Sequence, residues 1–225
     1  MPALVDILAH HVPLLLIDSA SARVQVGLFG PDNFVQWTAA DDEAGAAIFH
    51  CVEKLGVQLG SVAAFAFCEG PGSVLGIRTA AAALRTWNVL KSRPVFAFHS
   101  LAIVAQALAQ PGLTVIADAR RDSWHAVTVA SDGQPGPLQR LPTAELPGEL
   151  VTPAGFRAWS KLARPCRTTA YDLAALLALP RVAQADLFRA TTDPDAFMHE
   201  EPSYVTWTPR IHRAPTPPAS SASSS

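Results

Sequence analysis

Apolar and polar positions along the first forty residues predict three strands in succession. Val12 to Asp18 is a nearly continuous apolar run that ends in an acid, which is typical of a buried strand running into a turn. Residues 23–28 alternate between polar or small and apolar side chains, the period-two pattern of a half-buried strand. A turn at residues 31–33 then leads to Phe34–Thr38. The pattern therefore predicts a β-meander at the start of the fold.

The next segment alternates between helical and extended patterns. Acids at residues 41–43 precede a helical stretch that closes at Gly56, and Ser61 to Cys68 returns to an apolar strand. The stretch from Val74 to Lys91 is rich in Ala and Leu with no proline, so it predicts a long helix. A short strand (Val95–Phe98) and a helix (Ser100–Ala109) follow. These elements indicate an α/β fold.

The opening pattern recurs 100 residues later. Leu15 to Asp18, a polar turn and an alternating strand are matched by Val115 to Asp118, a polar turn and a strand from Trp124 to Val129. Two halves that open in the same way indicate duplicated α/β units. The second half is less regular, and only three of its stretches look helical: Pro153–Leu162, Ala170–Leu179 and Val182–Thr191. Glu201–Trp207 is a last extended segment.

These patterns divide the chain into four parts. Residues 1–11 are a solvated lead-in, 12–100 a first unit, and 101–213 a second, smaller unit with a C-terminal segment. Residues 214–225 contain only Ala, Pro, Ser and Thr, a composition that has almost nothing to bury, so we expect this tail to stay outside the fold.

Composition excludes several classes of protein. Apolar residues make up 49% and charged residues 16%, which argues against disorder over most of the chain. The net charge of −2 provides no global basic field, so a role on tRNA or DNA would need a partner. No apolar run approaches the roughly 18 residues of a spanning helix, and no basic residue precedes Arg23 as a secretory signal requires. We therefore expect a cytoplasmic protein that does not span a membrane.

The segment from Gly70 to Ser73 is the first candidate for chemistry. It links a strand to a helix through a tight glycine turn containing Gly72, and a helix N-terminus offers N–H groups to an anion. It lacks the lysine of a Walker loop, so ATP binding in that manner is unsupported. The alternative, which we favour, is that Ser73 caps the helix. Arg78, one turn into the helix, would either steer an anion or form a surface ion pair.

Asp18 and Asp118 each end an apolar strand, where paired acids could hold a metal and a phosphate. Neither is followed by a glycine turn, so we favour turn capping for both. The histidines lack the spacing of metal ligands on one helix, and no nucleophile motif singles out a hydrolase. We therefore predict no metal site. Cys68, at the end of an apolar strand, is expected to be unreactive.

Four segments together resemble the TsaB (YeaZ) family. They are Leu15–Ser21, Gly70–Arg78, Asp118–Arg120 and Glu201–Tyr204, in the family's order over about residues 13–207. The resemblance implies the duplicated actin/Hsp70/sugar-kinase (ASKHA) fold and a role in making threonylcarbamoyladenosine beside the anticodon of tRNA. It also implies a non-catalytic subunit that pairs with TsaD, which carries the metal and transfers the threonylcarbamoyl group, while TsaE, a P-loop ATPase, joins the pair.

The same resemblance implies how cofactors and partners are distributed. ATP and metal are expected on the partner subunits, tRNA is met only through the complex, and the chain alone could form a homodimer. The alternative function is a small ASKHA-fold phosphotransferase or hydrolase that uses Asp18, Asp118 and the glycine loop. The chain departs from the family at Val74 and Leu75 and at Thr206, where Phe, Thr and Arg are usual.

The long helix from Val74 to Lys91 is the candidate partner interface. One of its faces carries small residues and an aromatic anchor, and another carries an apolar stripe that would hold the helix on its sheet. The periodicity leaves two interpretations, because both faces could be buried within the chain. The resemblance favours the interface, so we expect a partner to contact the small face formed by Gly76, Ala80, Ala83 and Trp87.

Overall fold

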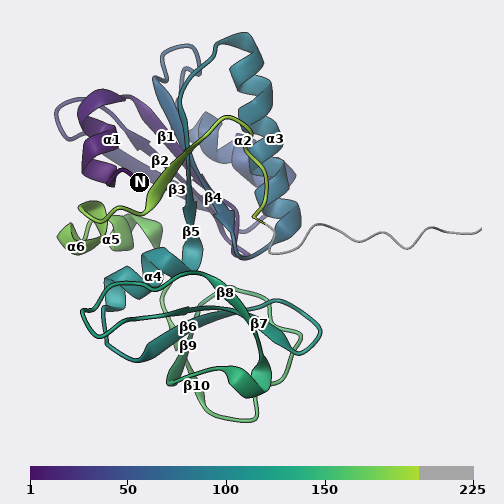
Figure 1. The fold of residues 1–225 in the computed structure, drawn as a ribbon. Coiled ribbons are helices and arrows are strands. Elements are labelled where there is room, and N and C mark those ends of the chain that lie inside the picture. Colours follow the sequence, from purple (N-terminus) through teal and green to yellow (C-terminus); the bar gives the residue numbers. More distant parts are fainter. Residues whose placement is uncertain (198–225) are drawn as a thin grey trace, which may run out of the picture.

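The computed structural model describes residues 1–197, which form two β-sheets with helices on and between them (Figure 1). The first sheet has the order β11-β5-β4-β1-β2-β3. Its strands are β1 (Leu14–Asp18), β2 (Val24–Phe29), β3 (Val35–Ala40), β4 (Ala64–Gly70), β5 (Val95–His99) and β11 (Phe188–Thr191). Helices α2 (Ala44–Lys54) and α3 (Val74–Leu90) pack against it. The core strands β1 and β4 are buried along their whole length, which explains their continuous apolar sequence.

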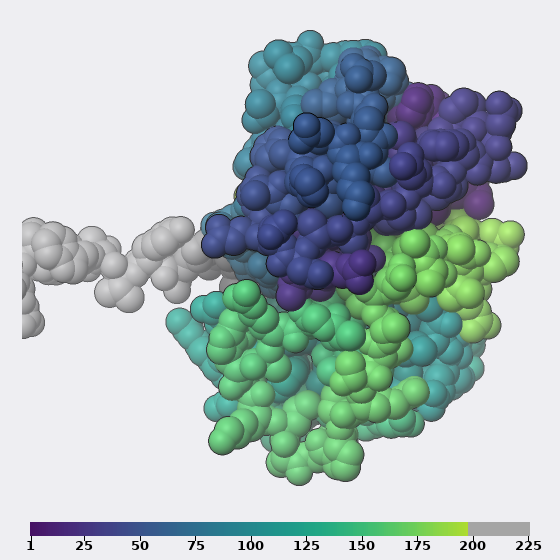
Figure 2. Space-filling view, turned by 180° about the vertical axis from the view of Figure 1, so that it is seen from behind, coloured from purple at the N-terminus to yellow at the C-terminus, as the bar shows by residue number. Residues whose placement is uncertain are grey.

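The second sheet has the order β10-β9-β6-β7-β8. Its strands are β6 (Leu113–Asp118), β7 (Ser123–Thr128), β8 (Gln139–Pro142), β9 (Glu149–Pro153) and β10 (Cys166–Thr169), with a short 3₁₀ helix, η1 (Thr143–Glu145), before β9. In Figure 2 the green surface of this half lies below the purple and blue surface of the first. Helix α4 (Ser100–Leu108) lies between the sheets and contacts strands of both.

The two sheets repeat one topology. In each, the first strand pairs antiparallel with the second, the second antiparallel with the third, and the first parallel with the fourth. The fifth strand then pairs parallel with the fourth. The duplication expected from the sequence repeat is thus confirmed. The second half is the reduced one: the short 3₁₀ helix η1 stands in the place of α2, and residues 154–165 join β9 to β10 as irregular chain in the place of α3.

Several expected elements of the second half differ in the structure. Residues 154–165 are not helical, because Asp118 accepts the backbone N–H groups of Trp159 and Ser160. The stretch Ala170–Leu179 forms only the short helix α5 (Leu173–Leu177). The stretch Val182–Thr191 divides between α6 (Pro180–Ala183) and β11, and β11 extends the first sheet because Phe188 buries its ring against Phe98.

The N-terminal residues also differ from expectation. Instead of a solvated lead-in, Leu4–His10 form helix α1, whose Leu4 and Ile7 are buried three residues apart on one face. The carbonyl of Pro2 accepts the N–H of Phe188, which ties the N-terminus to β11. The expected extended segment Glu201–Trp207 and the 214–225 tail lie outside the described residues. Among residues 1–197, no helix is long and apolar enough to cross a membrane.

Candidate functional site

Asp18 ends β1 inside the first half and is fully buried. Its Oδ1 accepts the N–H of Ala20 at 2.9 Å and its Oδ2 accepts the hydroxyl of Tyr171 at 2.6 Å. Burial raises the pKa of this carboxyl, although these hydrogen bonds work in the opposite direction. The expected turn-capping role is confirmed. Because Tyr171 precedes α5, the acid also links the two halves of the chain.

The glycine turn is packed against the turn that follows Asp18. The N–H of Ser73 donates to the carbonyl of Ala20 at 2.7 Å. A Cβ atom added at Gly72 or Gly76 would collide with the carbonyl oxygens of Ala20 and Ser19 respectively, and Gly72 also has a positive φ of 156°. The glycines therefore allow two backbone segments to touch. The Ser73 hydroxyl caps α3 by accepting from the Gly76 N–H, which is the role favoured for it from the sequence.

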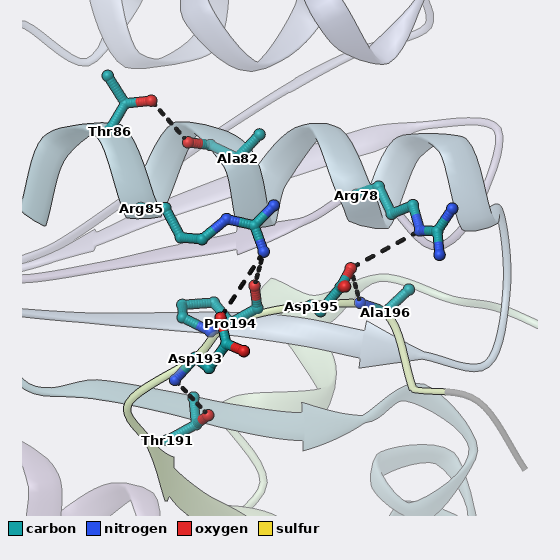
Figure 3. Close-up of polar contacts among 9 residues, drawn as sticks. All are labelled: Arg78, Ala82, Arg85, Thr86, Thr191, Asp193, Pro194, Asp195 and Ala196. Atoms are coloured by element: carbon teal, nitrogen blue, oxygen red, sulfur yellow. Dashed lines mark hydrogen bonds and ion pairs between the residues drawn. The ribbon is translucent and has the colours of Figure 1, made fainter. Parts of the chain in front are cut away.

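A C-terminal strap, defined here as residues 192–197, runs alongside α3 (Figure 3). Arg78 Nε lies 3.7 Å from a carboxylate oxygen of Asp195. Arg85 Nη1 donates to the carbonyl of Pro194 at 2.6 Å, and the Asp193 carboxylate lies 3.9 Å away. Of the two roles open to Arg78, the structure shows the ion pair. Both cations are directed at the chain's own strap.

The strap ends at a buried acid that the sequence patterns did not single out. Glu69, the penultimate residue of β4, accepts from Arg189 Nη2 at 2.6 Å, and His99 Nε2 lies 3.2 Å from its other oxygen. Burial alone would raise the pKa of Glu69, but His99 and Arg189 outweigh this effect and lower it. The Phe197 N–H donates to the Glu69 carbonyl at 2.7 Å. His99 and Arg189 are 30 and 120 positions from Glu69 in the sequence, so only the fold reveals this cluster.

Asp118, the counterpart of Asp18, lies at a partly exposed turn of the second half. Its carboxylate accepts backbone N–H groups of Arg120, Trp159 and Ser160. Its partial burial would raise the pKa, but these donors outweigh that effect and lower it. Turn capping is confirmed here too. Within residues 1–197, the hydrogen bonds that Asp18 and Asp118 accept run to different partners.

The remaining candidates from the sequence are the Cys68 thiol and the side chains that could bind a metal. Cys68 is buried, and that burial raises the pKa of its thiol well above the usual range, so it stays protonated as expected. Within residues 1–197, no three His, Cys, Asp or Glu side chains gather as a metal site would require.

The expected partner face of α3 requires correction. Gly76, Ala80, Ala83 and Trp87 are all buried within the chain. Trp87 contacts the ring of Phe65 on β4 and the edge of Phe49 on α2, with ring centroids 5.7 and 6.1 Å apart. Because α2 and the turn after Asp18 cover this face, it offers no free surface to a partner. Periodicity could not reveal this, since two apolar faces fit a helix packed between a sheet and a second helix.

A different line of residues on α3 is exposed, apart from one half-buried member, Thr79. This α3 stripe consists of Leu75, Thr79, Ala82, Thr86 and Val89, spaced alternately four and three residues apart. Leu75 is 79% exposed and Val89 86%. The Thr79 and Thr86 hydroxyls donate to the carbonyls of Leu75 and Ala82, so the polar groups of the stripe are satisfied within the helix. The stripe is therefore unusually apolar for a surface helix.

Comparison with known proteins agrees with this architecture. Residues 42–134, less than half of the chain, match the family model TsaD, tRNA N6-adenosine threonylcarbamoyltransferase. YeaZ from Pseudomonas aeruginosa is 23% identical, with a TM-score of 0.51 over 62% of this chain and 74% of that one. The predicted resemblance to the TsaB (YeaZ) family is confirmed. With it, the ASKHA-like α/β fold is confirmed as well.

A second solved structure shows the same fold. It is a protein described as similar to peptidase YeaZ from Pseudomonas aeruginosa, 22% identical, with a TM-score of 0.51 over 72% of this chain and 88% of that one. No curated protein sequence matches the chain. Over residues 42–134 the chain is therefore similar to a family whose description names tRNA modification.

Proposed function

We propose that this chain is a cytoplasmic, non-catalytic partner subunit in the synthesis of threonylcarbamoyladenosine on tRNA. In this proposal a TsaD-like paralogue supplies the metal and the transfer reaction, and a TsaE-like ATPase joins the pair. The chain itself needs no ATP or metal, meets tRNA within the complex, and forms a homodimer when its partner is absent.

The observation that carries the proposal is the way the candidate acid and glycine positions are used. Asp18 is buried against Tyr171, and the glycine turn is closed by the backbone of Ser19 and Ala20. A phosphotransferase or hydrolase would need these groups open to a substrate. The alternative enzyme that uses Asp18, Asp118 and the glycine loop is therefore the weaker candidate.

The α3 stripe is the surface we propose for partner contact, in place of the buried small face. Residues at alternating four- and three-residue spacing are those by which one helix packs along another. Val74 and Leu75, two departures from the family pattern, are 50% and 79% exposed, so they enlarge the apolar area at the start of the stripe. Burying such side chains against a partner helix would contribute roughly 1.5–3 kcal/mol for each large aliphatic residue.

Association of the purified full chain with the TsaD-like paralogue tests the proposal. We expect the two proteins to elute as one complex in size-exclusion chromatography with light scattering, and the double variant Leu75→Arg/Val89→Arg to lose the complex. A charge placed at a desolvated contact is strongly unfavourable. Val5→Arg is the matched control, because Val5 is an exposed aliphatic residue on a different helix, α1. A folded double variant that still forms the complex would eliminate the stripe as the interface.

A further inference from the structure

The irregular connection between β9 and β10 carries an unusual set of side chains. Between Arg157 and Arg167 the chain has four basic residues and no acid. Trp159, in the same segment, is 59% exposed. Exposing a tryptophan side chain to water is unfavourable. Surfaces that combine an exposed aromatic ring with several cations are typical of sites that bind an anionic, planar ligand.

A second segment joins this one through Asp118. Residues 120–122 follow Asp118 and have three consecutive positive φ angles of 63°, 53° and 54°. A run of such conformations in non-glycine residues persists only where the surroundings hold it. Here the Asp118 carboxylate accepts the N–H of Arg120 and those of Trp159 and Ser160. The Thr143 N–H and hydroxyl both donate to the Asp122 carbonyl. The acid therefore fixes the arginine turn against the tryptophan segment.

The result is a basic–aromatic tip, defined here as Arg120, Arg121, Arg157, Trp159 and Lys161. The Arg120 guanidinium lies over the Trp159 ring, 4.6 Å from its centroid. Both residues line a hollow of about 350 Å³ together with Arg121, Asp122 and Ser160. An arginine stacked on one part of an indole makes a pre-formed platform on which a further planar group can stack.

The charges of the tip are not neutralised within the described chain. Among residues 1–197, none of its four cations forms an ion pair, and Asp122 is the acid that lines the hollow. Arg164 and Arg167, in the same segment, behave differently. Arg164 donates to the Leu146 carbonyl at 2.6 Å, and Arg167 lies 2.9 Å from the Glu149 carboxylate. The chain thus separates structural arginines from cations that face solvent.

We propose that the basic–aromatic tip binds a single-stranded segment of RNA, with a base stacked on Trp159 and backbone phosphates on the four cations. An acidic peptide would satisfy the cations but not the stacked indole, whereas an unpaired nucleotide satisfies both. The choice of RNA rests on the proposed function, of which this is the substrate-contacting surface. It also explains how a chain of net charge −2 could contact a polyanion: the positive charge is local.

Binding of a fluorescently labelled single-stranded RNA of about eight nucleotides to the full chain tests the inference. We expect saturable binding near 50 mM salt, with anisotropy as the readout. Trp159→Leu should weaken it roughly 5- to 150-fold, because stacking on one aromatic contributes about 1–3 kcal/mol. Trp159→Phe, which keeps an aromatic ring, should retain much of the RNA affinity that Trp159→Leu loses. Arg121→Gln/Lys161→Gln should weaken binding and lower the slope of log affinity against log salt by about 1.4.

Two controls keep the result specific. Arg167→Gln removes a cation from the same segment that is already paired with Glu149, so RNA affinity should change less than twofold. Binding that does not depend on Trp159, or that polyglutamate displaces as well as RNA does, would overturn the inference. So would an absence of saturable binding. Trp159→Leu should leave association with the TsaD-like paralogue intact, and Leu75→Arg/Val89→Arg should leave RNA binding intact, so failure of either proposal is recognised separately.

Discussion

The two halves of the molecule contain the same acid turn and use it in opposite ways. In both, an acid ends the first strand and accepts an N–H group of the turn that follows it. Asp118 also accepts from Trp159 in the connection after the fourth strand, whereas Asp18 accepts from the Tyr171 hydroxyl. Asp18 is buried and its pKa is raised, whereas Asp118 is partly exposed and its pKa is lowered. The repeated acid thus makes buried hydrogen bonds in the core of the first half. In the second half it holds two surface segments together by accepting their backbone N–H groups.

The connections themselves diverge in the same manner. In the first half, Ser73 caps α3 and the chain continues as a helix whose outer surface is the apolar α3 stripe. In the second half, Asp118 takes the N–H groups of Trp159 and Ser160, and the chain remains irregular. A helix presents a regular row of side chains, while a stapled loop presents a few fixed ones. We infer that the halves specialise, one for a protein partner and one for RNA.

The largest expected effect in this comparison is on stability. Asp18→Ala leaves the buried hydroxyl of Tyr171 and the N–H of Ala20 without their acceptor, which should cost about 2–3 kcal/mol. In Asp118→Ala, the N–H groups of Arg120, Trp159 and Ser160 can bond to water instead, so the free energy of unfolding should fall by about 1 kcal/mol or less. Urea unfolding followed by circular dichroism measures both values. An equal or reversed order would show that the two acids are not used differently.

A smaller effect distinguishes the acids by pH. A raised pKa in the folded state means that Asp18 contributes most below the unfolded value of about 3.9, and that this contribution is lost as pH rises above it. The lowered pKa of Asp118 contributes stability above about 3.9, which is lost as pH falls below it. The stability difference between wild type and Asp18→Asn should therefore change above pH ~4, and that for Asp118→Asn below it. Parallel curves for the two variants would contradict the assignment.

Much of the first half could be predicted from sequence because its signals are local. The helix expected at Val74–Lys91 is α3, Val74–Leu90, since Ser73 supplies the cap and no proline interrupts the stretch. The repeat could also be recognised from the sequence. Strands β1 and β6 are both buried on their two faces, so both require a continuous apolar run. Favouring turn capping for Asp18 and Asp118 succeeded because neither acid precedes a glycine turn.

What could not be predicted depends on contacts between distant residues. The burial of Trp87 results from α2, and a helical period cannot say which neighbour covers which face. The local pattern at Val182–Thr191 favours a helix, because the pairing partner of β11, β5, lies about 90 positions earlier in the sequence. Glu69 was overlooked because His99 and Arg189 reach it only in the fold. The helical pattern of Pro153–Leu162 was overridden by one carboxylate from β6.

Reconstituted threonylcarbamoylation of tRNA tests the central claim most directly, that surfaces rather than acid turns carry the function. The chain would be combined with its TsaD-like and TsaE-like partners, ATP and a threonylcarbamoyl donor, and modified adenosine counted by mass spectrometry. We expect activity to require the chain, to survive Asp18→Asn within about twofold, and to fall at least tenfold with Leu75→Arg/Val89→Arg. Loss of activity in a folded, partner-bound Asp18→Asn variant, with full activity in the stripe variant, would contradict the account.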